Sequence, residues 1–448
     1  MYKLILISRY LLKRRITHFA VLTVALCVFI VVVVMTVMSG LVGDFKKKNH
    51  AFVGDCVIGT KSLVGFPYYE ELMDTLEQTD FVEATSAVVK NYALLKAGSD
   101  EASRGLEVMG LDPVRHSRTT NFGQTLYHRA DEVARAFVPS YDPNATGCVL
   151  GIDLALYRNA QSEYVYDARP ASIALNLTCF PLNARGAPAK AGSVPVSTQR
   201  FYYSDHSHSG IARVDYSTIY VPLERAQALC MAGALKRVTA IHIKFRPGTP
   251  LEQGRDRARA LWTQFRLEKQ DAADSHLLDN VTVETWKEYR RAYIAPMEKE
   301  EVLLGVMFSF VGITAVFIVF VVFYMIVSHK TKDIGVLKSV GASSTSVLAL
   351  FSGFATAVGV LASCAGILTA LLFLGHINRI ENWLYERFGW QLWDRTIYAI
   401  GEIPHRVEFG MLIVIICCAI AACQIGALLP AYWAARLRPV ETLHGSRT

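Results

Sequence analysis

The stretch DHSHSG (205–210) gathers residue types that bind metals or move protons. Asp205, His206 and His208 stand close together in it. A zinc site needs further ligands at fixed spacing, and a third ligand at helical or strand spacing is missing here. The pattern therefore favours a surface loop over a metal site, and we predict no metal ion in this chain.

Other chemistry-bearing motifs are absent from the sequence. It has no G-x-x-x-x-G-K-[ST] phosphate loop, no H-E-x-x-H and no C-x-x-C pair. We therefore predict no catalytic residue, no cofactor bound by this chain and no ATP bound through a phosphate loop. Any ATP or Mg²⁺ would be bound by a partner.

The nine cysteines fall into two groups. Five lie in long apolar runs, where they pack as small apolar side chains: Cys27, Cys364, Cys417, Cys418 and Cys423. Four lie in a region expected outside the cytoplasm: Cys56, Cys148, Cys179 and Cys230. In an oxidising compartment these four allow two disulfides by any of three connectivities, and the sequence does not choose among them.

The elements around these residues are those of a membrane protein. The chain has 448 residues, is 52% hydrophobic and has a mean hydropathy of +0.28. Four charge-free stretches are long enough to cross a bilayer, which takes about 20 apolar residues. They run over 19–41, 302–327, 347–374 and 409–435. The first is too long for a signal peptide and lacks an A-x-A cleavage pattern, so we expect it to be retained.

Basic residues near the span ends predict the orientation. They gather in the N-terminal segment, in the stretch after the second span and in the tail, which we therefore place in the cytoplasm. The net charge of +7 is then a topology signal and not a sign of nucleic-acid binding. The spans contain no Asp, Glu, Lys, Arg or His, which argues against a proton- or sodium-driven carrier.

The expected order of segments follows from these spans. It is a cytoplasmic segment (1–18), span one (19–43), an extracytoplasmic α+β domain (44–282), a stalk helix (283–301), span two (302–327), a cytoplasmic helix (328–345), span three (346–374), an extracytoplasmic interfacial segment (375–408), span four (409–435) and a cytoplasmic tail (436–448). Within the domain, short apolar runs from Cys148 to about Val221 predict a β-rich insert of the sandwich or barrel type. The stalk is expected to run into span two, with a kink at Pro296.

The stretch HKTKDIGVLKSVGAS (329–343) stands between spans two and three. Ile334, Leu337 and Val340 recur at helical spacing among charged residues, which predicts a short amphipathic helix. A plain connection would need only a few polar residues. The alternatives are a helix that docks on a partner and a helix that lies on the membrane surface.

Several stretches, in their order along the chain, resemble the FtsX-like permeases of ABC transporters, in particular the lipoprotein-releasing (LolC/LolE) branch. The similar stretches include SRYLLKRR (8–15), VMTVMSGLVGDFK (34–46), LEVMGLDP (106–113), SHKTKDIGVLKSVGAS (328–343) and LLPAYWAARLRPVETL (428–443). The resemblance implies four spans, with a MacB-like periplasmic core and its β-rich insert between spans one and two. It also implies the cell inner membrane.

The resemblance further implies a mechanism. A separate LolD-like ATPase would bind the short helix, and motion would pass through the stalks to the exported domains of two permeases, the second a copy or a paralogue. Cargo would be lipoproteins or other lipid-anchored proteins, passed to a periplasmic carrier. The implied ATPase-coupling residues are Lys332, Asp333, Ile334, Leu337, Lys338, Val340 and Gly341. The implied stalk residues are Trp286, Tyr289 and Glu298. The implied cargo-lipid site is Val31, Val34, Met35, Met38, Phe308 and Phe310.

One segment departs from the family pattern. Residues 116–147 are long and polar where the family often has a short connection. Two further functions of the same fold remain open: a MacB-type export permease and an FtsX-type permease that controls a cell-wall hydrolase. A non-transporting membrane receptor or scaffold is the alternative of another class, and it would have no need of the short amphipathic helix.

Overall fold

The computed structural model of the chain divides into two compact units. The membrane unit comprises Met1–Gly43, Pro296–Trp393 and Glu402–Thr448, and the exported unit comprises Asp44–Ala295 and Asp394–Gly401. The residues whose structure is described are 15–97, 103–158, 164–165, 172–188, 196–233, 235–329, 331–389, 403–404 and 407–436, without the side chains of 15, 16 and 332.

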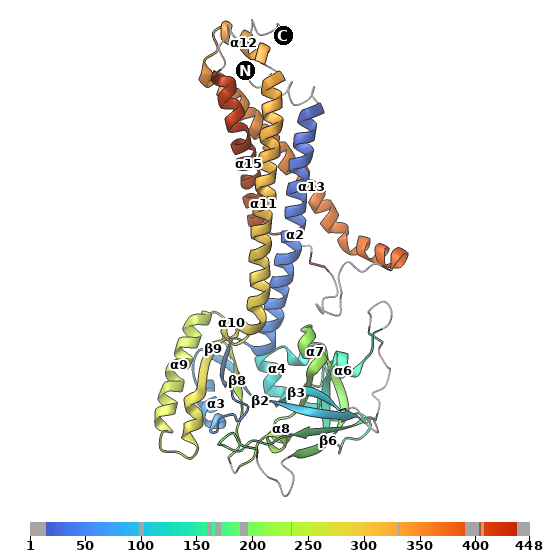
Figure 1. The fold of residues 1–448 in the computed structure, drawn as a ribbon. Coiled ribbons are helices and arrows are strands. Elements are labelled where there is room, and N and C mark those ends of the chain that lie inside the picture. Colours follow the sequence, from blue (N-terminus) through green and yellow to red (C-terminus); the bar gives the residue numbers. More distant parts are fainter. Residues whose placement is uncertain are drawn as a thin grey trace. The chain divides into compact units, whose positions relative to one another are not determined.

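Four long helices of the described chain are apolar enough to cross a membrane. They are α2 (Arg15–Val53), α11 (Arg291–His329), α13 (Ser344–Phe388) and α15 (Phe409–Arg436), with the short α12 (Thr331–Ser339) between α11 and α13 (Figure 1). Each predicted charge-free stretch lies entirely inside one of these four helices. The four predicted spans are therefore confirmed.

The third span is longer than its apolar run. We expected a separate interfacial helix and loop from residue 375, but α13 continues without a break to Phe388. No proline occurs among residues 375–388, so no residue there forces the helix to end earlier. The residues of the predicted interfacial segment beyond 389 lie outside the described chain, except 403–404 and 407–408.

The spanning helices pack through a buried seam of apolar side chains, many of them small or β-branched. Its fully buried members include Val32 of α2, Val319 and Phe323 of α11, Ala355 of α13 and Ala427 of α15. At one point α15 approaches α11 so closely that a Cβ added to Gly426 would lie 2.6 Å from the Val316 carbonyl oxygen. Small residues at such points let helix backbones meet, as is common between membrane helices.

The exported unit is built on one mixed sheet of nine strands. The strands are β1 (Cys56–Thr60), β2 (Val82–Ala97), β3 (Arg104–Leu111), β4 (Gly147–Gly151), β5 (Ala174–Cys179), β6 (Ser197–Ser207), β7 (Thr218–Pro222), β8 (Ala240–Phe245) and β9 (Val281–Thr285). Their order is β3-β7-β4-β6-β5-β2-β8-β1-β9, and β2 also pairs with β3. That last pairing closes six of the strands into a ring.

The long strand β2 serves both parts of the sheet. Its first half, Val82–Val88, pairs with β8, which leads on to β1 and β9. Its second half pairs with β3 on one edge and with β5 on the other. Closing a ring removes exposed strand edges, which would otherwise invite pairing with other chains. The predicted insert does contain strands, β4 to β7. They form a closed ring only together with β2 and β3, so the insert is not a separate domain.

Short helices cover this sheet. Helices α3 (Tyr69–Glu77) and α9 (Leu251–Glu268) pack against the β8–β1–β9 part (Figure 1). The remaining elements of the unit are α4 (Pro113–Thr119), α5 (Phe122–Thr125), η1 (Val133–Arg135), α6 (Ile152–Ala155), α7 (Ala212–Ser217), α8 (Leu223–Cys230), η2 (Ser275–Asn280) and α10 (Trp286–Tyr289).

The stalk differs from its expectation. Residues 283–285 belong to β9, and the separate helix α10 (Trp286–Tyr289) begins with a capping box between Thr285 and Glu288. The long helix α11 starts only at Arg291 and then continues through Pro296 to His329. The predicted single helix over 283–301 is therefore wrong at its start, because a capped helical turn intervenes there.

The four exported cysteines are free thiols, and all are buried. Burial raises the pKa of the Cys56 thiol to about 12. Cys179, at the end of β5, and Cys230, at the end of α8, hydrogen-bond to each other through their side chains. Of the three connectivities that the sequence left open, only the one containing Cys179–Cys230 joins thiols that interact here.

Candidate functional site

The short helix α12 has a well-defined end. Gly341 has a φ of +103°, the Gly341 N–H donates to the Lys338 carbonyl, and the Ala342 N–H donates to the Leu337 carbonyl. These two bonds and a residue with positive φ form the glycine-terminated helix end that a side chain with a Cβ would strain. The chain therefore turns sharply at Gly341 before α13 begins.

The apolar residues of α12 do not share one environment. Ile334 is 3% exposed and belongs to the buried seam of the spanning helices, whereas Val336 is 51% and Val340 83% exposed. Leu337 and Lys338 are half-buried and Asp333 is exposed. The expectation that Ile334 faces an ATPase together with Leu337 and Val340 is therefore wrong for Ile334. The side chain of Lys332 lies outside the described part.

Lys338 fixes α12 to the end of the fourth span. Its Nζ donates a hydrogen bond of 2.5 Å to the Ala435 carbonyl oxygen, in the last turn of α15. The last carbonyls of a helix lack partners within it and carry partial negative charge, so a lysine is well placed there. The helix is thus held by Ile334 on one side and by Lys338 at its end, which leaves Val336 and Val340 on the surface.

An apolar cavity of about 380 Å³ lies within the membrane unit between α2, α11 and α15. Three of the six residues predicted for a cargo-lipid site line it: Val31, Met35 and Phe308. Val34, Met38 and Phe310 do not, and Phe310 is 63% exposed. Consecutive residues of one helix cannot all face the same side, and the sequence did not say which side faces the cavity.

The α15 residues that line the cavity were not predicted from the sequence. Met411, Ile415, Cys418 and Ala422 line the cavity at spacings of three or four residues, which is one face of a helix. Such spacing in a span that is apolar all round is a weak signal, because every face of that helix looks alike. Two glycines of α11, Gly305 and Gly312, also line the cavity.

The cavity suits an uncharged hydrocarbon occupant. None of the described residues that line it is charged. Its one hydroxyl, Ser309 Oγ, already donates to the Val306 carbonyl at 2.6 Å within its own helix. Ligand cavities are typically about 300–1,000 Å³ and mostly apolar, and this one is at the small end of that range. It offers no polar group that would hold an ion or a sugar.

In the exported unit, the end of α2 packs against α10 and against Arg290, the residue that precedes α11. The His50 ring stacks on the predicted stalk residue Trp286, with centroids 4.8 Å apart. Arg290, which is 4% exposed, donates from Nε to Asn49 Oδ1 at 2.8 Å. Tyr289, also predicted for the stalk, packs in the same apolar cluster, whereas Glu298 lies exposed on α11. A buried guanidinium that is hydrogen-bonded to the other helix makes the junction stiff.

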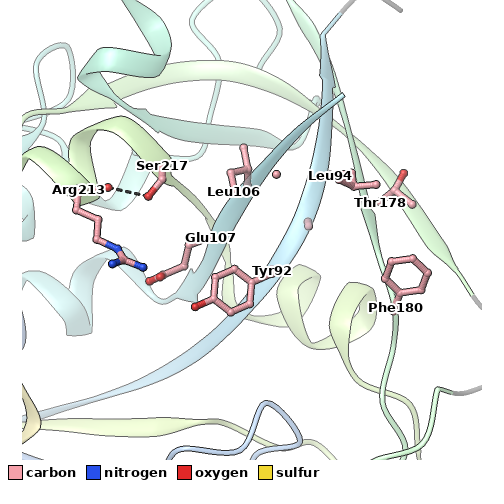
Figure 2. Close-up of a pocket in the computed structure, with 10 residues that line it drawn as sticks. Tyr92, Leu94, Leu106, Glu107, Thr178, Phe180, Arg213 and Ser217 are labelled. Carbon is pink, nitrogen blue, oxygen red and sulfur yellow. Dashed lines mark hydrogen bonds between the residues drawn. The ribbon is translucent and has the colours of Figure 1, made fainter. Parts of the chain in front are cut away.

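The exported unit also has a shallow hollow of about 330 Å³ over β2, β3 and β5. Figure 2 shows Tyr92, Leu94 and Phe180 beside it, with Glu107 and Arg213 at one end. Tyr92 and Phe180 are 53% and 51% exposed. These residues were not predicted from the sequence, because an exposed aromatic residue in or beside a strand cannot be told from a core residue by its type alone.

Comparisons with known proteins agree with this arrangement. Residues 305–439, which include α12, match the family described as FtsX-like permease C-terminal. Over 428 residues the chain is 23% identical to "Lipoprotein-releasing system transmembrane protein LolC" of Neisseria meningitidis serogroup B, covering 96% of this chain and 94% of that protein. The LolC protein of Xylella fastidiosa (strain 9a5c) is 21% identical, over 95% of this chain and 92% of its own length.

Among solved structures, the chain is similar to the periplasmic region of MacB from Actinobacillus actinomycetemcomitans. The sequence identity is 10%, over 54% of this chain and 94% of that one, and the TM-score of 0.30 is too low to support an inference about the fold. The family match over residues 305–439, the two LolC relatives and the four spans support an FtsX-like permease close to LolC, located in the inner membrane and carrying a periplasmic domain.

Proposed function

We propose that this permease couples ATP hydrolysis by a separate ATPase subunit to the extraction of lipoproteins, or other lipid-anchored proteins, from the inner membrane. The apolar cavity between α2, α11 and α15 carries the proposal. An acyl anchor is an uncharged hydrocarbon, and a cavity without charged walls can accept it without desolvating a charge. The names of the LolC relatives support the same cargo class.

The source of energy is a LolD-like ABC ATPase that binds at α12. Val336 and Val340 are the apolar side chains that α12 leaves on its surface, and Asp333 is exposed beside its first turn. Burying two valines against a partner contributes about 1.5–3 kcal/mol each. Because Ile334 and Lys338 fix α12 to the spans, a push on α12 is passed to the helices that line the cavity.

The permease acts as a lever and not as an aqueous pore. Its spans hold no Asp, Glu, Lys, Arg or His over the predicted charge-free stretches, so they offer no charged path for ions or water-soluble cargo. The exported unit would move with α2 and α11 because of the buried junction at Arg290. A second permease, a copy or a paralogue, and a periplasmic carrier complete the proposed assembly, with the second permease closing the open side of the cavity.

Photo-crosslinking tests the cargo site with matched positions. A photoreactive amino acid at Phe308, which lines the cavity, is compared with one at Phe310, which is exposed on the same helix. We expect Phe308 to crosslink lipid-anchored proteins in cells and Phe310 to crosslink bulk phospholipid. Met35 and Met38 form a second pair on α2 with the same expectation.

Equal crosslinking of lipoproteins from Phe308 and Phe310 would show that the cavity does not hold the anchor. Crosslinks to soluble periplasmic proteins without a lipid anchor would favour a MacB-type export permease instead.

A further inference from the structure

The polar segment that departs from the family pattern lies against the end of β6. Its Thr125 carbonyl accepts from the His208 N–H at 2.8 Å, and its Tyr127 N–H donates to the His206 carbonyl at 3.2 Å. Thr125 Oγ1 and Ser207 Oγ are 2.7 Å apart. Backbone and side-chain bonds thus fasten residues 125–128 to the strand that carries the sequence DHSHSG.

Asp205 organises the same place from within the strand. Its carboxylate is fully buried and accepts three backbone N–H groups, with Oδ1 accepting from His128 and His206 and Oδ2 from Arg129. Oδ2 therefore keeps a lone pair. Among the described residues, no lysine or arginine side chain forms an ion pair with it. A buried carboxylate without a cationic partner is costly.

His206 is oriented by two tyrosines. Tyr203 Oη lies 2.7 Å from His206 Nδ1, and the Tyr127 ring stacks on the imidazole with centroids 4.8 Å apart. A partner on one imidazole nitrogen fixes the ring and presents the other nitrogen, which is the usual support of a histidine that binds a metal. His206 is 2% exposed, so this orientation is held firmly.

His128 supplies the third group. One ligand atom from each of His128, Asp205 and His206 lies within 4.8 Å of the other two. The rings of His128 and His206 meet edge to face, with centroids 5.5 Å apart. Ligands of one zinc ion at bond lengths of about 2.0–2.2 Å stand closer than 4.8 Å, so binding would draw the three atoms together. His128 is half-buried on a loop and can make that movement.

We propose that His128, Asp205 and His206 form a site for a divalent transition-metal ion, with Zn²⁺ as the best fit. Two imidazoles and one carboxylate suit zinc and its neighbours, whereas calcium and magnesium take oxygen ligands. The three residues leave one coordination position for water or a partner's side chain. Bound metal would clamp the polar segment 116–147 to the periplasmic domain and neutralise the buried carboxylate.

From the sequence we predicted no metal at DHSHSG, because no third ligand stood at helical or strand spacing. The third ligand is His128, far upstream in the chain, and not His208, whose Nε2 lies 4.0 Å from Asp215 instead. The prediction that the chain binds no metal would thus be reversed by this site. His128 comes from the segment by which this chain departs from the family pattern, so the proposed site is independent of the proposed cargo function.

The test is zinc binding by the full-length chain in detergent, with affinity tags removed and metal stripped by a chelator. Competition with a chromogenic chelator gives the affinity for Zn²⁺, and Co²⁺ absorption reports the ligand geometry. We expect one high-affinity Zn²⁺ per chain and a melting temperature that Zn²⁺ raises. His128→Gln, a change at a half-buried loop position, should lower the affinity at least about tenfold and abolish the melting shift.

His208→Gln and His276→Gln are the controls. Both residues have imidazoles outside the proposed ligand set, and His276 is exposed, so both variants should bind Zn²⁺ as the unaltered chain does. Tight Zn²⁺ binding that His128→Gln leaves unchanged would overturn the proposal. So would an unaltered chain that binds no more Zn²⁺ than the His128 variant does, with both folded by circular dichroism.

Discussion

The contacts that stabilise the membrane unit internally differ in kind from those that stabilise the exported unit. In the exported unit, strands far apart in sequence are hydrogen-bonded into a ring, and buried polar groups such as Arg290 and Asp205 have specific partners. In the membrane unit the helices meet through small apolar residues. A polar cluster between described spans lies at Gln424 of α15, which bonds to Ser352 and Thr356 of α13.

This difference fits two mechanical roles. Directional bonds lose their strength when groups move by an ångström, so the exported unit should move as one body. Contacts between apolar helices are not directional and lose less when helices slide or tilt. Under the proposed function, the membrane unit would open and close a cavity and the exported unit would deliver that movement outside the membrane.

The largest effect should come from Val340→Asp. Val340 is 83% exposed and would be buried only by the ATPase. Loss of the apolar contact and burial of an unpaired charge together cost about 5 kcal/mol, which is more than about a thousandfold in affinity. ATPase retained on the immobilised permease is the measurement. Thr345→Asp, exposed at the start of α13, should retain the ATPase, and equal loss from both variants would contradict the docking face.

Asn49→Ala should destabilise the exported unit next most. The substitution leaves the guanidinium of Arg290 buried without its Oδ1 acceptor, at a cost of about 3 kcal/mol. Thermal unfolding of the full chain, followed by hydrogen exchange of the strands, measures it. Asn144→Ala, at an exposed turn, should change nothing. If Asn49→Ala unfolds like Asn144→Ala, the junction does not hold the exported unit as we describe.

Gly426→Ala should loosen the contact between α15 and α11. The added methyl would lie 2.6 Å from the Val316 carbonyl oxygen, and overpacking of this kind costs about 1–3 kcal/mol. Gly410→Ala is the matched control on the same helix, because nothing lies within 4 Å of its added methyl. Stability in detergent should fall only for Gly426→Ala; a fall for both would point to helix propensity or lipid contact instead.

Gln424→Leu should have the smallest effect of the four. Hydrogen bonds between membrane helices contribute only about 0.6 kcal/mol on average, because the separated helices also find partners. The same detergent-stability assay applies. A loss larger than that of Gly426→Ala would mean that polar bonds, and not small-residue packing, hold the membrane unit, and the contrast between the two units would disappear.

Much of the fold follows from the sequence, because its strongest signals are local. Hydropathy alone predicts the four spans, since a bilayer demands long apolar helices. Short apolar runs between Cys148 and about Val221 predict the β-rich character of the region that contains β4, β5, β6 and β7. The helix between spans two and three is predicted because charged residues interrupt two apolar runs and its apolar residues keep helical spacing.

The features that the sequence does not predict depend on contacts between residues far apart in the chain. Ile334 and Val340 belong to the same set of apolar residues in the short stretch between spans two and three, and only the packed spans show that the first is buried and the second exposed. Closure of the strand ring rests on the pairing of β2 with both β3 and β5. His128 lies beside Asp205 across 77 residues of sequence, as its N–H donating to Asp205 Oδ1 shows, and no spacing rule reaches that far.

ATP-dependent release of a lipid-anchored protein from proteoliposomes tests the central claim most directly. The liposomes hold this permease, its ABC ATPase and a lipoprotein, and released protein is measured with Gly312→Phe and Gly410→Phe variants. Gly312 lines the cavity and Gly410 does not. The account predicts that Gly312→Phe lowers release at least about tenfold while retaining the ATPase, and that Gly410→Phe releases normally. Equal release by the two variants would contradict it.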